Sequence, residues 1–244
     1  MNMLAFDTCF GGCSVAAGWN ASGTNASGTG GPFASDHAVS RFERLERGHA
    51  ERLPPMIAAV LEEAPFAVSD LDVIVVTTGP GTFTGQRVGI AAARALSLAS
   101  GAPVAVLSSL AVMAYTAAAE IGPEIAGKVL AVAVDARRGE IYFQAFAGDG
   151  LAPLNAPTLT TPEAAAQILE GRVAISVGSG ADMLAKAAQA LDRAPVTARL
   201  GALEPDVRFI PFSSVVPGAG LPQPLYLRPP DAKPQDGASL KRVS

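Results

Sequence analysis

Cysteine is scarce in this sequence: the 244 residues include only Cys9 and Cys13. A reducing compartment keeps such thiols free, and cysteine is among the residue types that are most often buried. We therefore expect two buried, unpaired thiols and no disulfide framework.

Long apolar runs are lacking as well. No stretch approaches the roughly 18 apolar residues that a membrane-spanning helix needs. The N-terminal sequence MNMLAFDTCFGG has neither the basic start nor the long apolar centre of a signal peptide. The sequence therefore predicts a cytoplasmic protein with no membrane partner.

Histidine occurs only at His37 and His49. A metal-binding helix would carry a second histidine one turn after His49, and Leu53 stands at that position. His37 belongs to an expected strand. We therefore expect no metal site.

Positive charge is in deficit. The chain has 18 Lys and Arg against 22 Asp and Glu, which gives a net charge of −4. It therefore has no global positive field to attract a polyanion. Any nucleic acid would have to be held mainly by another molecule.

Apolar residues, in contrast, make up 49% of the chain, enough for one large core or two modest ones. Two apolar runs separated by Gly11 and Gly12 predict a hairpin over residues 3–19, and a third antiparallel strand is expected over residues 37–44. Residues 20–35, rich in Gly, Ser, Thr and Asn, predict a flexible loop.

Two helices are expected next. Apolar residues over 53–64 recur at helical spacing, and two prolines near the start of this stretch either begin the helix or kink it. Residues 84–100 form an alanine-rich helix on which Arg87, Ile90 and Arg94 share one face. Buried strands are expected over residues 71–77 and 104–107.

A second cycle of strands and helices follows. Strands are expected over residues 129–134, 140–146 and 174–178, and helices over 162–169 and 181–191. The repetition predicts two related α/β lobes. We place the N-terminal lobe at residues 1–103, the C-terminal lobe at 104–224 and an extended, proline-rich strap at 225–244.

The most specific local feature is a glycine loop between the strand 71–77 and the helix 84–100. Its glycines permit close backbone approach, and the helix N-terminus beside it suits an anion. However, the spacing G-x-G-x-x-x-G is neither a dinucleotide fingerprint nor a P-loop. A structural loop in which Thr82 or Thr84 caps the helix is therefore favoured over phosphate binding. The glycine loop consists of Gly79, Pro80, Gly81, Thr82, Phe83, Thr84 and Gly85.

Polar residues at the ends of expected strands outline a candidate nucleotide cleft. Asp7 and Asp135 each end an apolar strand shortly before a glycine, an arrangement that presents two carboxylates to a nucleotide-bound metal. A glycine-flanked turn over residues 178–180 could cover an adenine. All of these are also ordinary turn residues, so the structural reading stays open. The candidate nucleotide residues are Asp7, Thr8, Gly12, Asp135, Gly178 and Gly180.

Five stretches together resemble the TsaB family, also called YeaZ. They read LAFDTCFGGCSVAA, HAERLPPMIAAVLEEA, VIVVTTGPGTFTGQRVGIAAARALSLASGAPVAVLSSL, VAVDARRGEIYFQAF and PLYLRPPDAK. They stand in the family's order and span nearly the whole chain. The most specific pieces are GPGTFTGQRVGIAAARALS and DARRGEIY, whereas residues 20–35 are not required by the family pattern.

The resemblance implies a two-lobed α/β fold of the actin, sugar-kinase and heat-shock-chaperone ATPase type, with a mixed sheet and flanking helices in each lobe. It places Asp7, Thr8 and Asp135 at phosphate loops and residues 178–180 at an adenosine loop. Members of the family pair with the homologous catalytic subunit TsaD and the ATPase TsaE, which transfer threonylcarbamoyl to the adenosine next to the tRNA anticodon. TsaD-type chains carry an H-x-x-x-H metal pair, which His49 does not complete here.

The resemblance therefore implies a non-catalytic scaffold subunit that requires no cofactor, with ATP or ADP at the subunit or its interface as the open alternative. tRNA would be bound only indirectly, and a homodimer is expected without the partner. The helices 53–64 and 84–100 are expected to pack on TsaD, because the second is apolar around more of its circumference than one sheet covers. The expected interface residues are Leu53, Met56, Ile57, Val60, Leu61, Arg87, Ile90, Ala91, Arg94, Ala95 and Leu98.

Two other functions stay open. A free-standing ATPase or sugar kinase is compatible with the two-lobed fold, and nucleotide turnover by the isolated chain would favour it. A metallopeptidase is the second alternative, which stoichiometric zinc or iron in the purified protein would favour.

Overall fold

The computed structural model describes residues 1–19, 37–211, 214–218 and 220–228. The loop expected over residues 20–35 and the part of the strap beyond residue 228 lie outside the described residues. Within the part that is described, no helix is long and apolar enough to cross a membrane.

Two five-stranded mixed sheets form the framework of the chain, in the orders β3-β2-β1-β4-β5 and β10-β9-β6-β7-β8. In chain order, the first three strands of each sheet pair with one another antiparallel, and the last two are added in parallel. The second sheet thus repeats the topology of the first, which confirms the two related α/β lobes. The strands are β1 (Asn2–Asp7), β2 (Gly12–Trp19), β3 (Ala38–Arg44), β4 (Val73–Thr77), β5 (Val104–Leu107), β6 (Val129–Asp135), β7 (Ile141–Ala147), β8 (Thr158–Thr160), β9 (Ala174–Val177) and β10 (Val196–Arg199).

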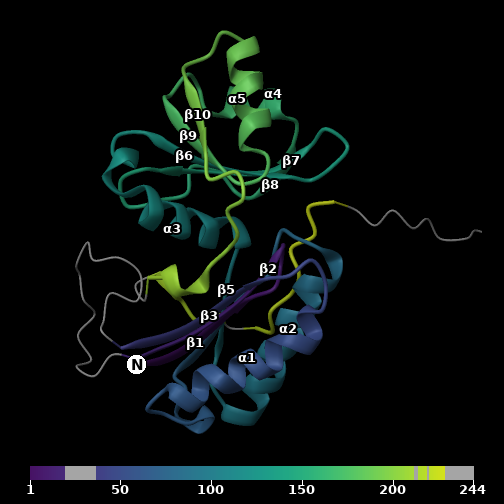
Figure 1. Ribbon diagram of the computed structural model, residues 1–244, viewed down its shortest axis with the longest axis vertical. Coiled ribbons are helices and arrows are strands. Elements are labelled where there is room, and N and C mark those ends of the chain that lie inside the picture. Colours follow the sequence, from purple (N-terminus) through teal and green to yellow (C-terminus); the bar gives the residue numbers. More distant parts are fainter. Residues whose placement is uncertain (20–36, 212–213, 219, 229–244) are drawn as a thin grey trace, which may run out of the picture.

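The helices lie in three layers around the sheets (Figure 1). Helices α1 and α2 cover the outer face of the first sheet, α3 lies between the two sheets, and α4 and α5 cover the outer face of the second. The helices are α1 (His49–Glu63), α2 (Phe83–Ser100), α3 (Ser109–Ile121), α4 (Pro162–Ile168) and α5 (Ala181–Ala190), with short 3-10 turns at η1 (Val68–Asp70), η2 (Gly122–Ile125) and η3 (Val207–Phe209).

Helix α3 is the layer that the two lobes share. Val112 packs into the core beneath the first sheet, whereas Leu110 and Met113 pack into the core of the second. A helix that packs on two layers is apolar around most of its circumference. The sequence analysis missed α3 because SLAVMAYTAAAEI shows no polar face from which a helical period could be read.

Helix α1 begins at His49, four residues before the expected start, and continues through Pro54 and Pro55 to Glu63. The two prolines are exposed, and their apolar neighbours on the other side of the helix point into the core. That buried stripe consists of Leu53, Met56, Ile57 and Val60. We expected it to face a partner, and this is wrong: the period that predicts the helix marks the side that packs on the lobe's own sheet.

The first sheet extends past the boundary that we placed after residue 103. Strand β5 pairs in parallel with β4 and is the edge strand of the first sheet, although the sequence analysis assigned it to the second lobe. The chain also returns to the first lobe near its end, where Gly218 N donates to Val104 O at 3.0 Å. Strands β8 and β10, each at a sheet edge, are short and were also missed.

Leucine-to-alanine substitutions distinguish the buried stripe of α1 from an exposed position on α2 by their effect on stability. Leu53 is 1% exposed, so Leu53→Ala removes a packed side chain and should lower the free energy of unfolding by about 2–5 kcal/mol. Leu98 on α2 is 90% exposed, so Leu98→Ala should change it by no more than about 0.5 kcal/mol. Urea denaturation of both variants measures the difference, and equal losses would contradict the assigned packing.

Candidate functional site

The glycine loop joins β4 to α2 and packs against the end of β1. Thr82 is the N-cap of α2 and its side chain accepts a hydrogen bond from Gly85 N at 3.1 Å, as the structural reading of the loop predicted. Thr82 N donates to Cys9 O at 2.7 Å, and the Thr8 hydroxyl donates to Gly85 O at 2.7 Å. The loop therefore binds strand β1, and its hydrogen bonds go to the protein itself.

Two glycines of this loop are required by space. A Cβ atom at Gly81 would lie 2.3 Å from Cys9 O, and one at Gly85 would lie 2.0 Å from Thr8 O. Both contacts are with backbone, which no side-chain rotation relieves. Close approach of two backbones, and not an exposed anion site, thus accounts for these glycines.

A cleft of about 230 Å³ lies between the two lobes and collects several of the candidate nucleotide residues. Asp135 and Ser179 line it from the second lobe, and Phe10 and Gly11, in the turn that follows Asp7 and Thr8, line it from the first. The structure thus brings together segments that the sequence could only mark separately. The lining consists of Phe10, Gly11, Glu46, Thr82, Met113, Val134, Asp135, Ser179, Leu203 and Glu204.

The predicted residues of the first lobe lie behind the cleft. Asp7 and Thr8 are 0% and 1% exposed, and Gly12 is buried against the Phe42 ring. Asp7 accepts hydrogen bonds from the Thr77 hydroxyl and from Cys9 N. Burial raises the pKa of Asp7 to about 7 despite these two donors. Asp7 is therefore a buried carboxyl of the core, not an exposed ligand.

The predicted residues of the second lobe form a compact turn around the end of β6. Asp135 N donates to the Ser179 hydroxyl at 3.0 Å, and Gly180 N donates to Ala133 O at 2.9 Å. Gly178 has a φ of 93°, and a Cβ there would lie 2.6 Å from Ala133 O. These glycines, like those of the glycine loop, allow two backbones to touch.

Glu204 dominates the electrostatics of the cleft and was missed by the sequence analysis. Its carboxylate accepts a hydrogen bond from Gly11 N at 3.1 Å, so a side chain of the protein already occupies this amide. Glu46, Asp135 and Glu204 all line the cleft, whereas no lysine or arginine does among the residues that the structure describes. A nucleotide phosphate would meet three carboxylates there, so it would bind only together with a cation that lies between them.

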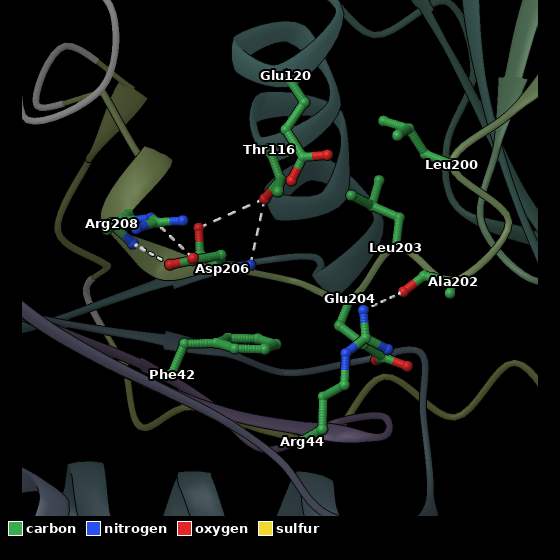
Figure 2. A pocket seen from close by; sticks show the side chains of 10 residues that line it. All are labelled: Phe42, Arg44, Thr116, Glu120, Leu200, Ala202, Leu203, Glu204, Asp206 and Arg208. Carbon is green, nitrogen blue, oxygen red and sulfur yellow. Dashed lines mark hydrogen bonds and ion pairs between the residues drawn. The ribbon is translucent and has the colours of Figure 1, made fainter.

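A second cavity of about 250 Å³ opens beside the cleft, and Figure 2 shows its lining. Leu203 and Glu204 form the wall between the two cavities. The polar groups of the second cavity bind one another: Arg208 pairs with Asp206 at 2.9 Å, and Asp206 N donates to the Thr116 hydroxyl at 3.2 Å. These hydrogen bonds join α3 to the linking chain, the segment around Asp206 that runs from the second lobe back to the first.

Helix α2 divides the expected interface residues into two groups. Ile90 is 4% exposed and belongs to the interior, which corrects its assignment to a partner surface, and Leu61 on α1 is half-buried against the core. Ala91, Ala95 and Leu98 face solvent. The exposed part of the expected interface is therefore one face of α2.

The two arginines of α2 bind the chain's own C-terminal segment, not an open surface as we expected. Arg94 donates to Pro222 O at 2.6 Å, and Arg87 donates to the Tyr226 hydroxyl at 2.8 Å. The Arg87 guanidinium also lies 3.5 Å from the centre of the Phe83 ring. Residues 220–228, which lead into the strap and include its described part 225–228, thus run along α2 (Figure 1).

The histidines contact other residues of the chain, and the cysteines are buried in it. The His49 ring nitrogen Nε2 lies 3.1 Å from Phe10 O, and His37 stacks on Trp19. Cys9 and Cys13 are buried and unpaired, as predicted. Over the described residues, no group of His, Cys, Asp and Glu is arranged to hold a metal ion.

The spatial requirement at Gly85 is testable by a pair of alanine variants. Gly85→Ala places a methyl carbon 2.0 Å from the Thr8 carbonyl oxygen, which is a steric clash. It should lower the free energy of unfolding by about 3 kcal/mol or more. Gly201→Ala is the control, because no atom lies within 4 Å of the added Cβ. Thermal unfolding measures both, and a Gly85→Ala variant as stable as the control would refute the close approach.

The buried carboxyl of Asp7 predicts a pH dependence of stability. Its pKa is about 7 in the folded chain against an ordinary 3.8, so between these values the folded state holds a proton that the unfolded state lacks. This proton stabilises the folded state at low pH. The free energy of unfolding then falls as the pH rises from 3.8 through the folded pKa of about 7, by up to about 4 kcal/mol in all. Asp7→Asn should remove this part of the dependence, so the stability of this variant relative to the wild type should rise from pH 5 to pH 8. Parallel stability curves for the two proteins would contradict the assignment.

Comparison with known proteins gives the family. A family model described as TsaD, tRNA N6-adenosine threonylcarbamoyltransferase, matches residues 43–188. The tRNA threonylcarbamoyladenosine biosynthesis protein TsaB of Escherichia coli K12 is 36% identical over 149 residues, which are 61% of this chain and 56% of that protein. An uncharacterized protein of Mycobacterium tuberculosis H37Rv is 38% identical over 196 residues, covering 77% of this chain and 79% of that protein.

Solved structures agree with these relatives. The structure described as YeaZ from Pseudomonas aeruginosa superposes with a TM-score of 0.70 at 28% identity and covers 93% of this chain and 99% of that one. The match spans both sheets and their flanking helices, so the expected two-lobed α/β fold is confirmed. The chain belongs to the TsaB (YeaZ) family, within the wider family that the TsaD model describes.

Proposed function

We propose that this chain is the non-catalytic scaffold subunit of an assembly that makes threonylcarbamoyladenosine in tRNA. In this assembly it pairs with a TsaD-like catalytic subunit and a TsaE-like ATPase, which transfer threonylcarbamoyl to the adenosine next to the anticodon. The names of the relatives support the pathway, since the Escherichia coli protein is described as a threonylcarbamoyladenosine biosynthesis protein.

One observation carries the scaffold role: the exposed apolar face of α2. Leu98 is 90% exposed and lies on the same face as Ala91 and Ala95, whose small side chains let another helix approach closely. Contiguous apolar patches mark interaction sites, and we take the patch that Leu98 forms with these small residues as such a site. A TsaD-like chain is the proposed occupant, and a second copy of this chain would take its place in a homodimer.

The chemistry of the cleft supports a non-catalytic role. Without a bound cation its three carboxylates repel phosphates, and Glu204 occupies the Gly11 amide. We therefore propose that the chain requires no nucleotide of its own and that ATP is handled by the partner subunits. The same features argue against the free-standing ATPase or kinase.

The negative charge of the chain supports an indirect role toward tRNA. With a net charge of −4 it has no general affinity for a polyanion, so the bulk of the tRNA would be held by the other subunits.

Charges placed on the exposed face of α2 test the docking surface. Ala95→Asp with Leu98→Asp should weaken association with the TsaD-like subunit at least about 100-fold, because two carboxylates would be buried without partners. The matched control is Leu154→Asp with Leu191→Asp, two exposed leucines of the second lobe. Size-exclusion chromatography and calorimetry with the purified TsaD-like subunit measure the effect.

Unchanged association of the α2 variant would reject this surface. The pathway itself is tested separately: depletion of the chain in its own host should lower threonylcarbamoyladenosine in tRNA, as measured by mass spectrometry of nucleosides. An unchanged level would reject the proposed function, whereas turnover by the isolated chain would reject the non-catalytic role.

A further inference from the structure

Residues 225–228 contact both lobes, and we call them the clasp. Their anchor on the first lobe has two parts. Leu225 N donates to Thr78 O at 2.7 Å. The Tyr226 ring stacks on Phe83, with 5.6 Å between the ring centroids, and its hydroxyl accepts a hydrogen bond from α2. The clasp is thus fastened to the chain that follows β4 and to the first turns of α2.

The anchor on the second lobe is Arg228. Its guanidinium donates to Ala136 O at 2.9 Å and to the Glu140 carboxylate at 2.6 Å, both in the turn between β6 and β7. The Arg228 side chain is 22% exposed, so the ion pair is partly shielded from water, which strengthens the attraction between the two charges. A single side chain thus binds this turn to the clasp.

Both anchors adjoin the cleft between the lobes. Thr82 lines the cleft from the first lobe and Asp135 lines it from the second. The next residue after each of them, Phe83 and Ala136, is one that the clasp binds. Consecutive Cα atoms are about 3.8 Å apart. The clasp therefore limits how far these two walls of the cleft can separate.

The clasp is easier to release than the other connections between the lobes. Helix α3 is buried in the cores of both lobes, and the linking chain is continuous with the second lobe and bound to α3. Residues 225–228, in contrast, are all partly or fully exposed. Segments held by hydrogen bonds near the surface, with little apolar burial, open at a low cost in free energy. The clasp can therefore detach while both lobes stay folded.

We propose that the clasp sets the width of the cleft between the lobes, and that release of Arg228 from the β6–β7 turn lets the cleft open. In the released form the second lobe rotates by a small angle about α3, to which it stays packed. A molecule that needs to touch both walls is admitted only in this form. The inference concerns the chain alone and goes beyond the proposed function, which would stand even if the clasp had no effect.

Variants of the second anchor test the clasp. Arg228→Ala removes the guanidinium, and Glu140→Gln removes the charge of its partner on the other lobe. Arg199→Ala is the matched control for Arg228→Ala, since it breaks an ion pair with Glu124 inside the second lobe and changes the net charge equally. The charge-reversed pair, Arg228→Glu with Glu140→Arg, should form the ion pair again.

The measured quantity is the distance between the lobes in the full chain. Spin labels on Glu62→Cys in α1 and Gln189→Cys in α5 lie at exposed positions on the outer helices of the two lobes. Cys9 and Cys13 are buried and are therefore protected from the label. Double electron-electron resonance gives the distribution of distances. Hydrogen exchange of residues 225–228 records release of the clasp, and thermal unfolding records whether both lobes stay folded.

We expect the same narrow distribution for the wild type and for Arg199→Ala. In Arg228→Ala and in Glu140→Gln the distribution should broaden towards longer distances, and the amides of the clasp should exchange about tenfold faster, because a charged hydrogen bond is lost. The charge-reversed pair should narrow the distribution again in part. Recovery on charge reversal is a result that a general loss of stability would not produce.

Two results would overturn the inference. The first is an unchanged distance distribution in Arg228→Ala although the clasp exchanges faster, because other contacts would then set the width of the cleft. The second is an equal broadening in the Arg199→Ala control. If the clasp stays bound in Arg228→Ala, Tyr226→Ala is added to release the first anchor as well, and an unchanged distribution in this double variant would also reject the clasp.

Discussion

Burial of helix α3 on two sides is the constraint on which the arrangement of this protein depends. Val112 faces the core of the first lobe and Met113 that of the second, so a single helix closes both. Neither sheet can shift along α3 without exposing apolar surface. The hydrogen bond from Asp206 N to the Thr116 hydroxyl then ties the linking chain to the same helix. The cleft and its neighbouring cavity are what remains between two lobes held at this distance.

Close backbone contacts fix how α2 and the strap are placed on the outer surface. The glycine loop packs on the end of β1, which sets where α2 begins and therefore which of its faces is exposed. The strap then runs from α2 to the turn of the second lobe, through Tyr226 on one side and Arg228 on the other. Loop, helix and strap thus make the first lobe, the second lobe and the exposed face of α2 one connected unit.

The location of function follows from how the polar groups are satisfied. Glu204 in the cleft accepts a hydrogen bond from the Gly11 amide, and Asp7, buried behind the cleft, accepts one from the Thr77 hydroxyl. The most exposed large apolar side chain, Leu98, lies outside the cleft on α2. The proposed docking surface is therefore separate from the cleft.

Local patterns in the sequence determined all strands except β8 and β10, the helices α1 and α2, the N-cap at Thr82 and the free cysteines, because each depends on neighbours within a few residues. The repeated cycle of strands and helices predicted the two lobes, and the resemblance to a family added the proposed partners. Only the tertiary structure decided that the stripe of Leu53 is internal, that α3 joins the lobes, and that Arg87 and Arg94 hold residues 220–228. It also revealed Glu204 at Gly11. These pairings join residues far apart in the chain, and a long-range contact leaves no local period or motif from which it can be read.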